Sequence, residues 1–193
     1  MLQNKPRVFE DFIAAGEWLV SEKYASPATL GLTGVSNGGL LVGAALTKRP
    51  DLFRAVLCGF PDIDTLRFNQ FTTNNNMPAL LEYGDAAVKA QFDVIKTFSP
   101  YQAVTPNTPY PAVLVASGDL DTRVPPLAAR KFTARLQAST SSGRPVLLRY
   151  HPKGGHAANY GMPFSLRVQQ TAMDLAFMMR ELGLPLPAAA PTH

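Results

Sequence analysis

One serine in this sequence stands in a setting that could make it a nucleophile. Ser36 is the centre of a Gly-x-Ser-x-Gly pattern that runs from Gly34 to Gly38, between a β-prone run at 28–33 and a helix-prone run at 40–46. A serine in such a sharp strand-to-helix turn has a strained backbone and an exposed hydroxyl. Side chains two positions away on either side would collide, so the geometry is expected to require glycine at both places.

A serine hydroxyl reacts only when a base takes its proton, and the base needs an orienting carboxylate. Of the three histidines, His156 lies in a glycine-rich loop just beyond a predicted strand at 146–150. His151 ends that strand and reads as a structural or surface residue, and His193 lies in the C-terminal tail. Because parallel strands end at the same edge of a sheet, His156 is the base expected to lie beside Ser36.

The loop after a predicted strand at 111–118 offers two candidates for the carboxylate, Asp119 and Asp121. Serine, aspartate and histidine then follow one another in the chain order of α/β-hydrolases, each after a different predicted strand. The residues alone leave the choice between the two aspartates open.

The apolar pattern predicts an α/β fold with a mostly parallel sheet and helices on both faces. We expect a single domain over 1–184 and a flexible tail over 185–193. The expected strands are 28–33, 54–60, 111–118 and 146–150, and the expected helices are 7–24, 40–49, 86–96, 126–138 and 165–182. The irregular, aromatic-rich segment 61–109 is expected to line the substrate site, the alternative being a solvated loop.

Composition excludes several classes of function. The 193 residues are 46% hydrophobic and 17% charged, and the net charge of +4 comes from scattered basic residues, so no nucleic-acid partner is expected. The single cysteine, Cys58, reads as a buried core residue. No metal-ligand spacing, cofactor motif, signal peptide or membrane span is recognisable. The chain as given is therefore expected to be soluble and cytoplasmic and to need no cofactor or metal.

Three segments resemble the catalytic blocks of the prolyl oligopeptidase family of serine peptidases. They are Gly34-Val35-Ser36-Asn37-Gly38-Gly39, Asp119-Leu120-Asp121-Thr122-Arg123-Val124 and Gly155-His156. The segments 48–53, 82–85 and 98–101 are also similar, so the resemblance covers most of the chain. It implies the C-terminal part of an α/β-hydrolase catalytic domain, without the upstream strands and the β-propeller of the family.

The resemblance also implies roles for individual residues. Ser36 would be the nucleophile, Asp121 the orienting acid and His156 the base, and the backbone N–H of Asn37 would be one oxyanion donor. Arg123 matches a family arginine that hydrogen-bonds the backbone of a bound peptide; the alternative for it is a surface ion pair with Asp119 or Asp121.

Two differences from the family qualify the implied activity. The second oxyanion donor of the family, a tyrosine hydroxyl, belongs to the upstream segment, and loss of one such donor costs about 10²–10³ in rate. Prolyl-cleaving members have a tryptophan where this sequence has Ala79 or a neighbour, so strict proline preference is not implied. Besides hydrolysis of short peptides, the sequence is compatible with a small carboxylesterase and with a non-catalytic fragment. Without upstream strands the strand at 28–33 would form a sheet edge, which predicts a homodimer through that edge.

Overall fold

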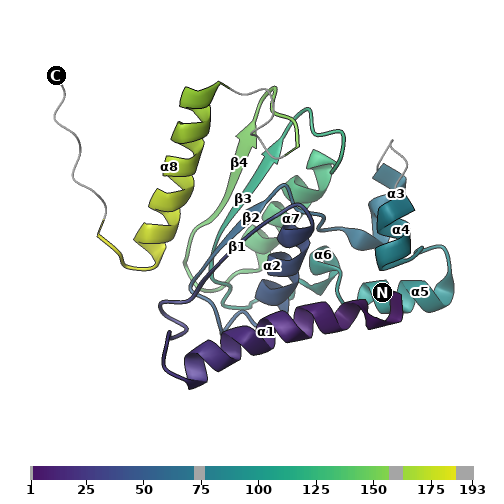
Figure 1. The fold of residues 1–193 in the computed structure, drawn as a ribbon, viewed down its shortest axis with the longest axis horizontal. Helices are drawn as coiled ribbons and strands as arrows, with labels where there is room; N and C mark the ends of the chain where they lie inside the picture. Colours follow the sequence, from purple (N-terminus) through teal and green to yellow (C-terminus); the bar gives the residue numbers. More distant parts are fainter. Residues whose placement is uncertain (1, 72–76, 157–162, 186–193) are drawn as a thin grey trace.

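The computed structural model of this chain describes residues 2–71, 77–156 and 163–185. Its centre is a sheet of four parallel strands in the order β1-β2-β3-β4, so each strand lies beside the next one along the chain (Figure 1). The strands are β1 (Gly31–Val35), β2 (Ala55–Gly59), β3 (Ala112–Gly118) and β4 (Val146–His151). Helices connect the strands, which confirms the α/β class.

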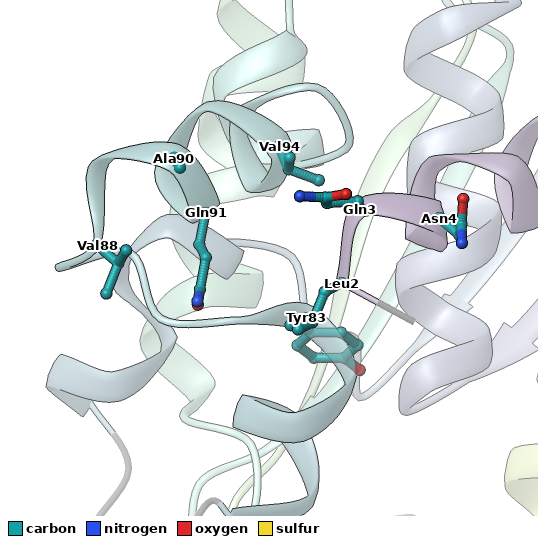
Figure 2. A pocket seen from close by; sticks show the side chains of 8 residues that line it. All are labelled: Leu2, Gln3, Asn4, Tyr83, Val88, Ala90, Gln91 and Val94. Atoms are coloured by element: carbon teal, nitrogen blue, oxygen red, sulfur yellow. The ribbon is translucent and has the colours of Figure 1, made fainter.

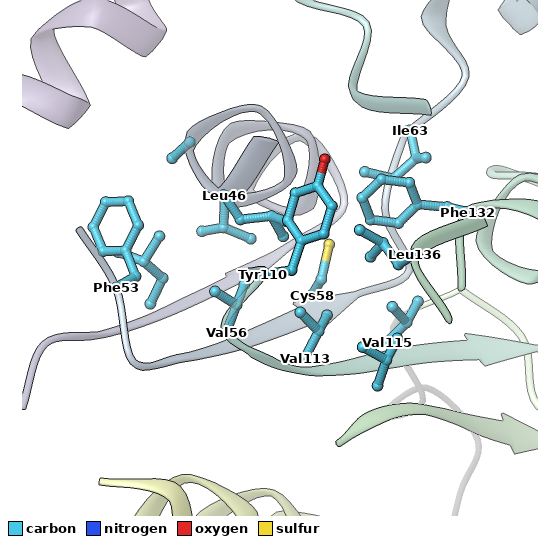
Figure 3. Packing of buried hydrophobic residues seen from close by; sticks show 14 of the residues in the cluster. Leu46, Phe53, Val56, Cys58, Ile63, Tyr110, Val113, Val115, Phe132 and Leu136 are labelled. Atoms are coloured by element: carbon cyan, nitrogen blue, oxygen red, sulfur yellow. The ribbon is translucent and has the colours of Figure 1, made fainter. Parts of the chain in front are cut away.

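Helices cover both faces of the sheet, as predicted. On one face, α2 (Asn37–Lys48) packs against β1 and β2, and α7 (Pro126–Ser139) packs against β3 and β4. The long helix α1 (Lys5–Ser21), which follows the short 3₁₀ turn η1 (Leu2–Asn4), packs against α2. On the opposite face lies α8 (Phe164–Glu181), as Figures 1 and 3 show.

The main core lies between the sheet and helices α2 and α7 (Figure 3). All seven residues of β3 are buried, as its continuous apolar run predicts. Large fully buried side chains fill this layer; they are Leu46, Phe53, Ile63, Tyr110, Phe132 and Leu136. Cys58 belongs to the same core, where burial raises the pKa of its thiol and its Sγ–H donates to the Gly39 carbonyl at 3.3 Å.

The connection between β2 and β3 is more helical than predicted. Its described residues, 60–71 and 77–111, contain five short helical segments: η2 (Thr65–Arg67), α3 (Phe68–Phe71), α4 (Met77–Tyr83), α5 (Lys89–Lys96) and α6 (Pro100–Ala103). The helix predicted over 86–96 begins only at Lys89, because the Asp85 carboxylate accepts the Ala87 N–H at 2.9 Å and the chain turns there.

The strand that leads into Ser36 begins later than the predicted 28–33. Residues 26–30 form a turn in which the Leu30 N–H donates to the Ser26 carbonyl at 2.9 Å, and the ladder with β2 begins at Gly31. β1 is an edge of the sheet, and within the described residues only β2 pairs with it. Alternate N–H and C=O groups of β1 therefore point away from the sheet.

Helix α8 is exposed along its length and carries several exposed apolar side chains. None of its residues is buried. It still contacts the sheet: Met178 Cε lies close to Gly31 of β1, 2.7 Å from where a Cβ would be, and Asp174 bonds Arg149 of β4. Its exposed apolar side chains include Leu166, Val168, Met173 and Leu175. In the part of the chain that the structure describes, no helix is long and apolar enough to cross a membrane. The cytoplasmic location stays a prediction, and the predicted tail falls outside the described residues from position 186 onward.

Candidate active site

Ser36 occupies the sharp turn between β1 and α2. Its backbone has φ 60° and ψ −120°. A positive φ at a non-glycine residue costs on the order of 1–3 kcal/mol and persists only where surrounding contacts hold it. Here the Ser36 N–H donates to the Gly59 carbonyl at 2.9 Å, and the Leu40 N–H donates to the Ser36 carbonyl at 3.1 Å. The turn therefore connects strand and helix in the manner expected of a nucleophile elbow.

The two glycines of the Gly-x-Ser-x-Gly pattern are not equivalent. A Cβ on Gly34 would lie 2.1 Å from the Gly38 carbonyl oxygen, so no larger residue fits there. A Cβ on Gly38 would meet nothing within 4 Å, so the prediction that both positions require glycine is wrong for Gly38. The second close approach is at Gly39, where a Cβ would lie 2.7 Å from Pro61 Cβ because α2 begins against the chain that leaves β2.

The structure brings the three predicted catalytic side chains together. His156 Nε2 lies 3.0 Å from Ser36 Oγ, and His156 Nδ1 lies 2.8 Å from Asp121 Oδ2. The imidazole packs edge-to-face with the ring of buried Phe60, with the centroids 5.9 Å apart, which restricts the tilt of the imidazole. Such a chain of hydrogen bonds lets the histidine take the proton of the serine hydroxyl.

Asp121, rather than Asp119, is the carboxylate at the histidine. Its side chain is fully buried, and its Oδ1 accepts the backbone N–H groups of Arg123 at 2.9 Å and Val124 at 2.8 Å. Asp119 lies on the surface and accepts the Tyr150 hydroxyl at 2.5 Å. Hydrogen bonds to both oxygens of Asp121 fix its orientation toward the imidazole.

The loops that carry the acid and the base are joined through their backbones. The Leu120 N–H donates to the Gly154 carbonyl at 2.9 Å, and the Asp119 N–H donates to the His151 carbonyl at 3.0 Å. This contact requires glycine at the end of β3, because a Cβ on Gly118 would lie 2.3 Å from the Gly154 carbonyl oxygen.

His151 has the structural role expected from the sequence. Its Nε2 accepts the Arg149 Nε–H at 3.1 Å, and its Nδ1 lies 3.1 Å from the side-chain amide of Gln170 on α8. Burial and the positive charge of Arg149 lower the pKa of this imidazole. Within the described residues, no three His, Cys, Asp or Glu side chains are grouped so that they could hold a metal ion.

Asn37 and Arg123 lie next to the three aligned side chains. Asn37 is the first residue of α2, so its N–H has no acceptor within the helix and belongs to the positive end of the helix dipole, directly after Ser36. Arg123 is exposed in the loop that carries Asp121. It forms no ion pair with Asp119 or with any other described residue, so the surface ion pair considered from the sequence is absent.

Sequence reasoning missed four residues that contact the Asn37 side chain directly or through one intervening residue. Tyr83 Oη donates to Asn37 Oδ1 at 3.0 Å, Asn37 Nδ2 donates to Glu82 Oε1 at 3.2 Å, and Lys5 Nζ bonds the same carboxylate oxygen. The fourth is Asp62, whose pKa is raised to about 8 by burial and by the nearby negative charge of Glu82. The segment 82–85 carried a resemblance but no assigned role, and no spacing connects it with Lys5 or Asp62.

The parallel sheet, the serine at a strand-to-helix turn and the acid and base on later loops define an α/β-hydrolase fold. This chain belongs to the prolyl oligopeptidase family, whose model matches residues 1–184. It is 41% identical over 183 residues to a prolyl endopeptidase of Elizabethkingia miricola, and this match covers 94% of this chain and 25% of that protein. It is 38% identical over 189 residues to prolyl oligopeptidase ophP of Omphalotus olearius, and this match covers 96% of this chain and 25% of that protein.

Solved structures agree with this assignment. A prolyl endopeptidase structure matches 95% of this chain with a TM-score of 0.89 and 38% identity, and the match covers 27% of that structure. Prolyl oligopeptidase B from Galerina marginata, bound to a 35mer hydrolysis and macrocyclization substrate, matches 96% of this chain with a TM-score of 0.87 and 33% identity, over 26% of its own length. The chain thus spans about a quarter of the length of the curated relatives it matches.

Proposed function

We propose that this chain acts as a serine hydrolase of the prolyl oligopeptidase type, which cleaves short peptides through an acyl-enzyme on Ser36. The observation that carries this proposal is the unbroken hydrogen-bonded path from Ser36 Oγ through His156 to Asp121, with distances of 3.0 Å and 2.8 Å. The prolyl endopeptidase and the prolyl oligopeptidase among its relatives support the same reaction class.

In this reaction Ser36 Oγ attacks the peptide carbonyl carbon while His156 Nε2 accepts the hydroxyl proton. His156 then donates that proton to the leaving amine as the C–N bond breaks, which leaves an ester on Ser36. Water attacks this ester and gives a proton to His156, which returns it to Ser36 Oγ as the carboxylic acid leaves. Asp121 holds the imidazole in the required orientation and stabilises its charged form.

Two further groups support the reaction. The Asn37 N–H would donate to the oxyanion of each tetrahedral intermediate, because it follows the nucleophile directly at the start of α2. Arg123 would bind a backbone carbonyl of the peptide, since its guanidinium is exposed and makes no ion pair with a described residue.

Hydrolysis of short acyl esters is a second candidate. The site is open enough for a small ester, since Ser36 and His156 are both partly exposed. Esters also need less stabilisation of the oxyanion than amides, and the only donor assigned in this chain is the Asn37 N–H. The comparison of a p-nitrophenyl ester with a peptide anilide would separate the two activities. The third alternative from the sequence is that the chain is a folded but catalytically inactive fragment.

The first test is the intact mass of the protein after treatment with a fluorophosphonate probe, on the wild type and on Ser36→Ala. We expect one adduct on the wild type and none on the variant, because only an activated serine displaces fluoride from phosphorus. An unlabelled wild type that is folded by circular dichroism would contradict the hydrolase proposal and favour the inactive fragment.

A further inference from the structure

The start of α2 lacks the capping side chain that usually stabilises a helix N-terminus. Ser36 is the N-cap residue, but its side chain makes no cap hydrogen bond, and its Oγ lies 3.0 Å from His156 Nε2 instead. The same residue has a positive φ, which its surroundings must maintain. The Leu40 N–H bonds the Ser36 carbonyl of the peptide plane between Ser36 and Asn37 at 3.1 Å. Contacts to the Asn37 side chain would add to this hold on the N–H that faces the reacting carbonyl in the proposed function.

The Asn37 side chain is held at both ends. Its Oδ1 accepts the Tyr83 hydroxyl at 3.0 Å, and its Nδ2 donates to Glu82 Oε1 at 3.2 Å. Both partners come from the last two residues of α4, which is separate from the strands that carry the catalytic side chains. A side chain fixed from two directions fixes its own Cα and limits rotation of the adjoining peptide plane.

The two partners are themselves fixed. The ammonium of Lys5, whose side chain is only 6% exposed, bonds Glu82 and lies 5.2 Å from the centroid of the Tyr83 ring. Burial and the nearby Glu82 carboxylate raise the pKa of Asp62 to about 8, which favours its protonated form, and Asp62 hydrogen-bonds Tyr83. A protonated Asp62 can donate to Tyr83 Oη, which leaves the phenol hydrogen for Asn37.

Lys5 also has an electrostatic consequence for the reaction. The Glu82 carboxylate is bonded to the residue that would bind the oxyanion, and an unpaired negative charge there would oppose the developing charge of the transition state. The nearly buried Lys5 ammonium offsets it. Tyr83 and η1 also line a cavity of about 370 Å³, together with Val88, Ala90, Gln91 and Val94 (Figure 2).

We propose that Lys5, Glu82 and Tyr83 are positioning residues that hold the Asn37 N–H toward the oxyanion and keep its surroundings electrically neutral. We name this group the Asn37 network. The inference rests on the proposed function, since it concerns the donor of the same oxyanion site.

The test compares second-order rate constants for labelling by a fluorophosphonate and turnover of a p-nitrophenyl ester. Tyr83→Phe should lower both rates about tenfold, with kcat reduced and KM nearly unchanged, because the lost contact affects the transition state. The matched control is Tyr110→Phe, a buried tyrosine whose hydroxyl accepts the Thr105 N–H at 2.8 Å and also bonds the Thr105 carbonyl and side-chain hydroxyl, away from the site. Both rates of Tyr110→Phe should stay within about twofold of the wild type, even if its Tm falls as much as that of Tyr83→Phe.

A charge-rescue pair tests the electrostatic part. Lys5→Met should lower both rates about tenfold or unfold the protein, because it leaves Glu82 uncompensated. The double variant Lys5→Met, Glu82→Gln should refold and recover to within about threefold of the wild type, since the amide can still accept the Asn37 Nδ2–H.

The possible failures can be told apart. If the folded wild type is not labelled, the hydrolase proposal fails, and this inference fails with it. If the wild type is labelled and Tyr83→Phe reacts as fast as Tyr110→Phe, or the double variant stays as slow as Lys5→Met, the inference alone is overturned.

Discussion

Two groups of residues flank Ser36, and they differ in how the chain assembles them. On one side, Asp121 and His156 come from loops after neighbouring parallel strands, and their backbones are bonded to each other. On the other side, the Asn37 network joins the first residue of α1 to the last two residues of α4. The first group would transfer protons, and the second would position the Asn37 N–H that donates to the oxyanion.

The two sides also treat a buried aspartate differently. Asp121 accepts two backbone N–H groups and faces an imidazole, so its oxygens meet hydrogen-bond donors. Asp62 faces Tyr83 and lies near the carboxylates of Glu82 and Asp64, and its pKa is raised to about 8. Burial and the neighbouring carboxylates together disfavour the charged form of Asp62.

The largest expected effect is on the proton-transfer side. His156→Ala removes the base, so kcat for a p-nitrophenyl ester should fall about 10⁵-fold or more, against about tenfold for Tyr83→Phe. Steady-state kinetics on both variants would measure the ratio. Equal losses would mean that the two sides of Ser36 do not divide the work as we describe.

Substitution of each aspartate by asparagine sharpens the comparison. Asp121→Asn should lower kcat about 10⁴-fold, because the histidine is then held in the wrong tautomer. Asp62→Asn should change kcat no more than about threefold at neutral pH, because an amide replaces a carboxyl group that is already uncharged. A large loss of activity in a folded Asp62→Asn variant would show that Asp62 takes part in the chemistry.

The two glycines around Ser36 predict opposite effects on stability. Gly34→Ala should lower the free energy of unfolding by about 3 kcal/mol, because the new Cβ would meet the Gly38 carbonyl oxygen. Gly38→Ala should be neutral or stabilising by up to about 1 kcal/mol, because it lies in a helix with open space at its Cβ. Urea denaturation would measure both, and similar losses would contradict the difference in packing between the two sides of the elbow.

The protonation state of Asp62 predicts a pH dependence of stability. Its folded-state pKa of about 8 lies above the ordinary value of 3.8, so unfolding releases a proton between these two values. Stability from this group is therefore full below about pH 4, decreases as the pH rises toward 8 by at most about 1.4 kcal/mol per pH unit, and changes no further above that.

Asp62→Asn removes this titration and is the control for it. The wild type should lose stability relative to the variant between roughly pH 5 and pH 7 in urea denaturation. If the free energies of unfolding of the two proteins change with pH in parallel, Asp62 is charged in the folded state. The carboxylates of Glu82 and Asp64 would then lie near that charge, with Lys5 as the nearby positive charge.

The smallest effect concerns the sheet edge, where we propose that two copies of the chain pair through β1. The Leu30 carbonyl and the Ser36 N–H bond the β2 side, so the intervening Thr33 directs its N–H and C=O outward. Thr33→Lys should convert a dimer to a monomer in sedimentation experiments without lowering Tm, because like charges would face each other. Val168→Lys, on the exposed side of α8, is the control. A monomeric wild type with protected amides in β1 would contradict the proposal.

The sequence alone predicted the parts of this protein that depend on local backbone chemistry. The strand-to-helix turn at Ser36, the order of serine, aspartate and histidine, and the fully buried β3 follow from glycine positions and apolar runs. Parallel strands end at one edge of a sheet, so even the meeting of His156 with Ser36 could be expected from the sequence.

Tertiary structure decided the rest, because those features depend on contacts between distant segments. The start of β1 is set by a turn at 26–30, and a side chain at Gly38 would have open space because no other segment lies within 4 Å of its Cβ position. Lys5 meets Glu82 across 77 positions of sequence, and no spacing in the sequence connects the two residues. Helix packing brings these charges to Asn37. Neither periodicity nor spacing in the sequence predicts which distant side chains the folded chain buries together.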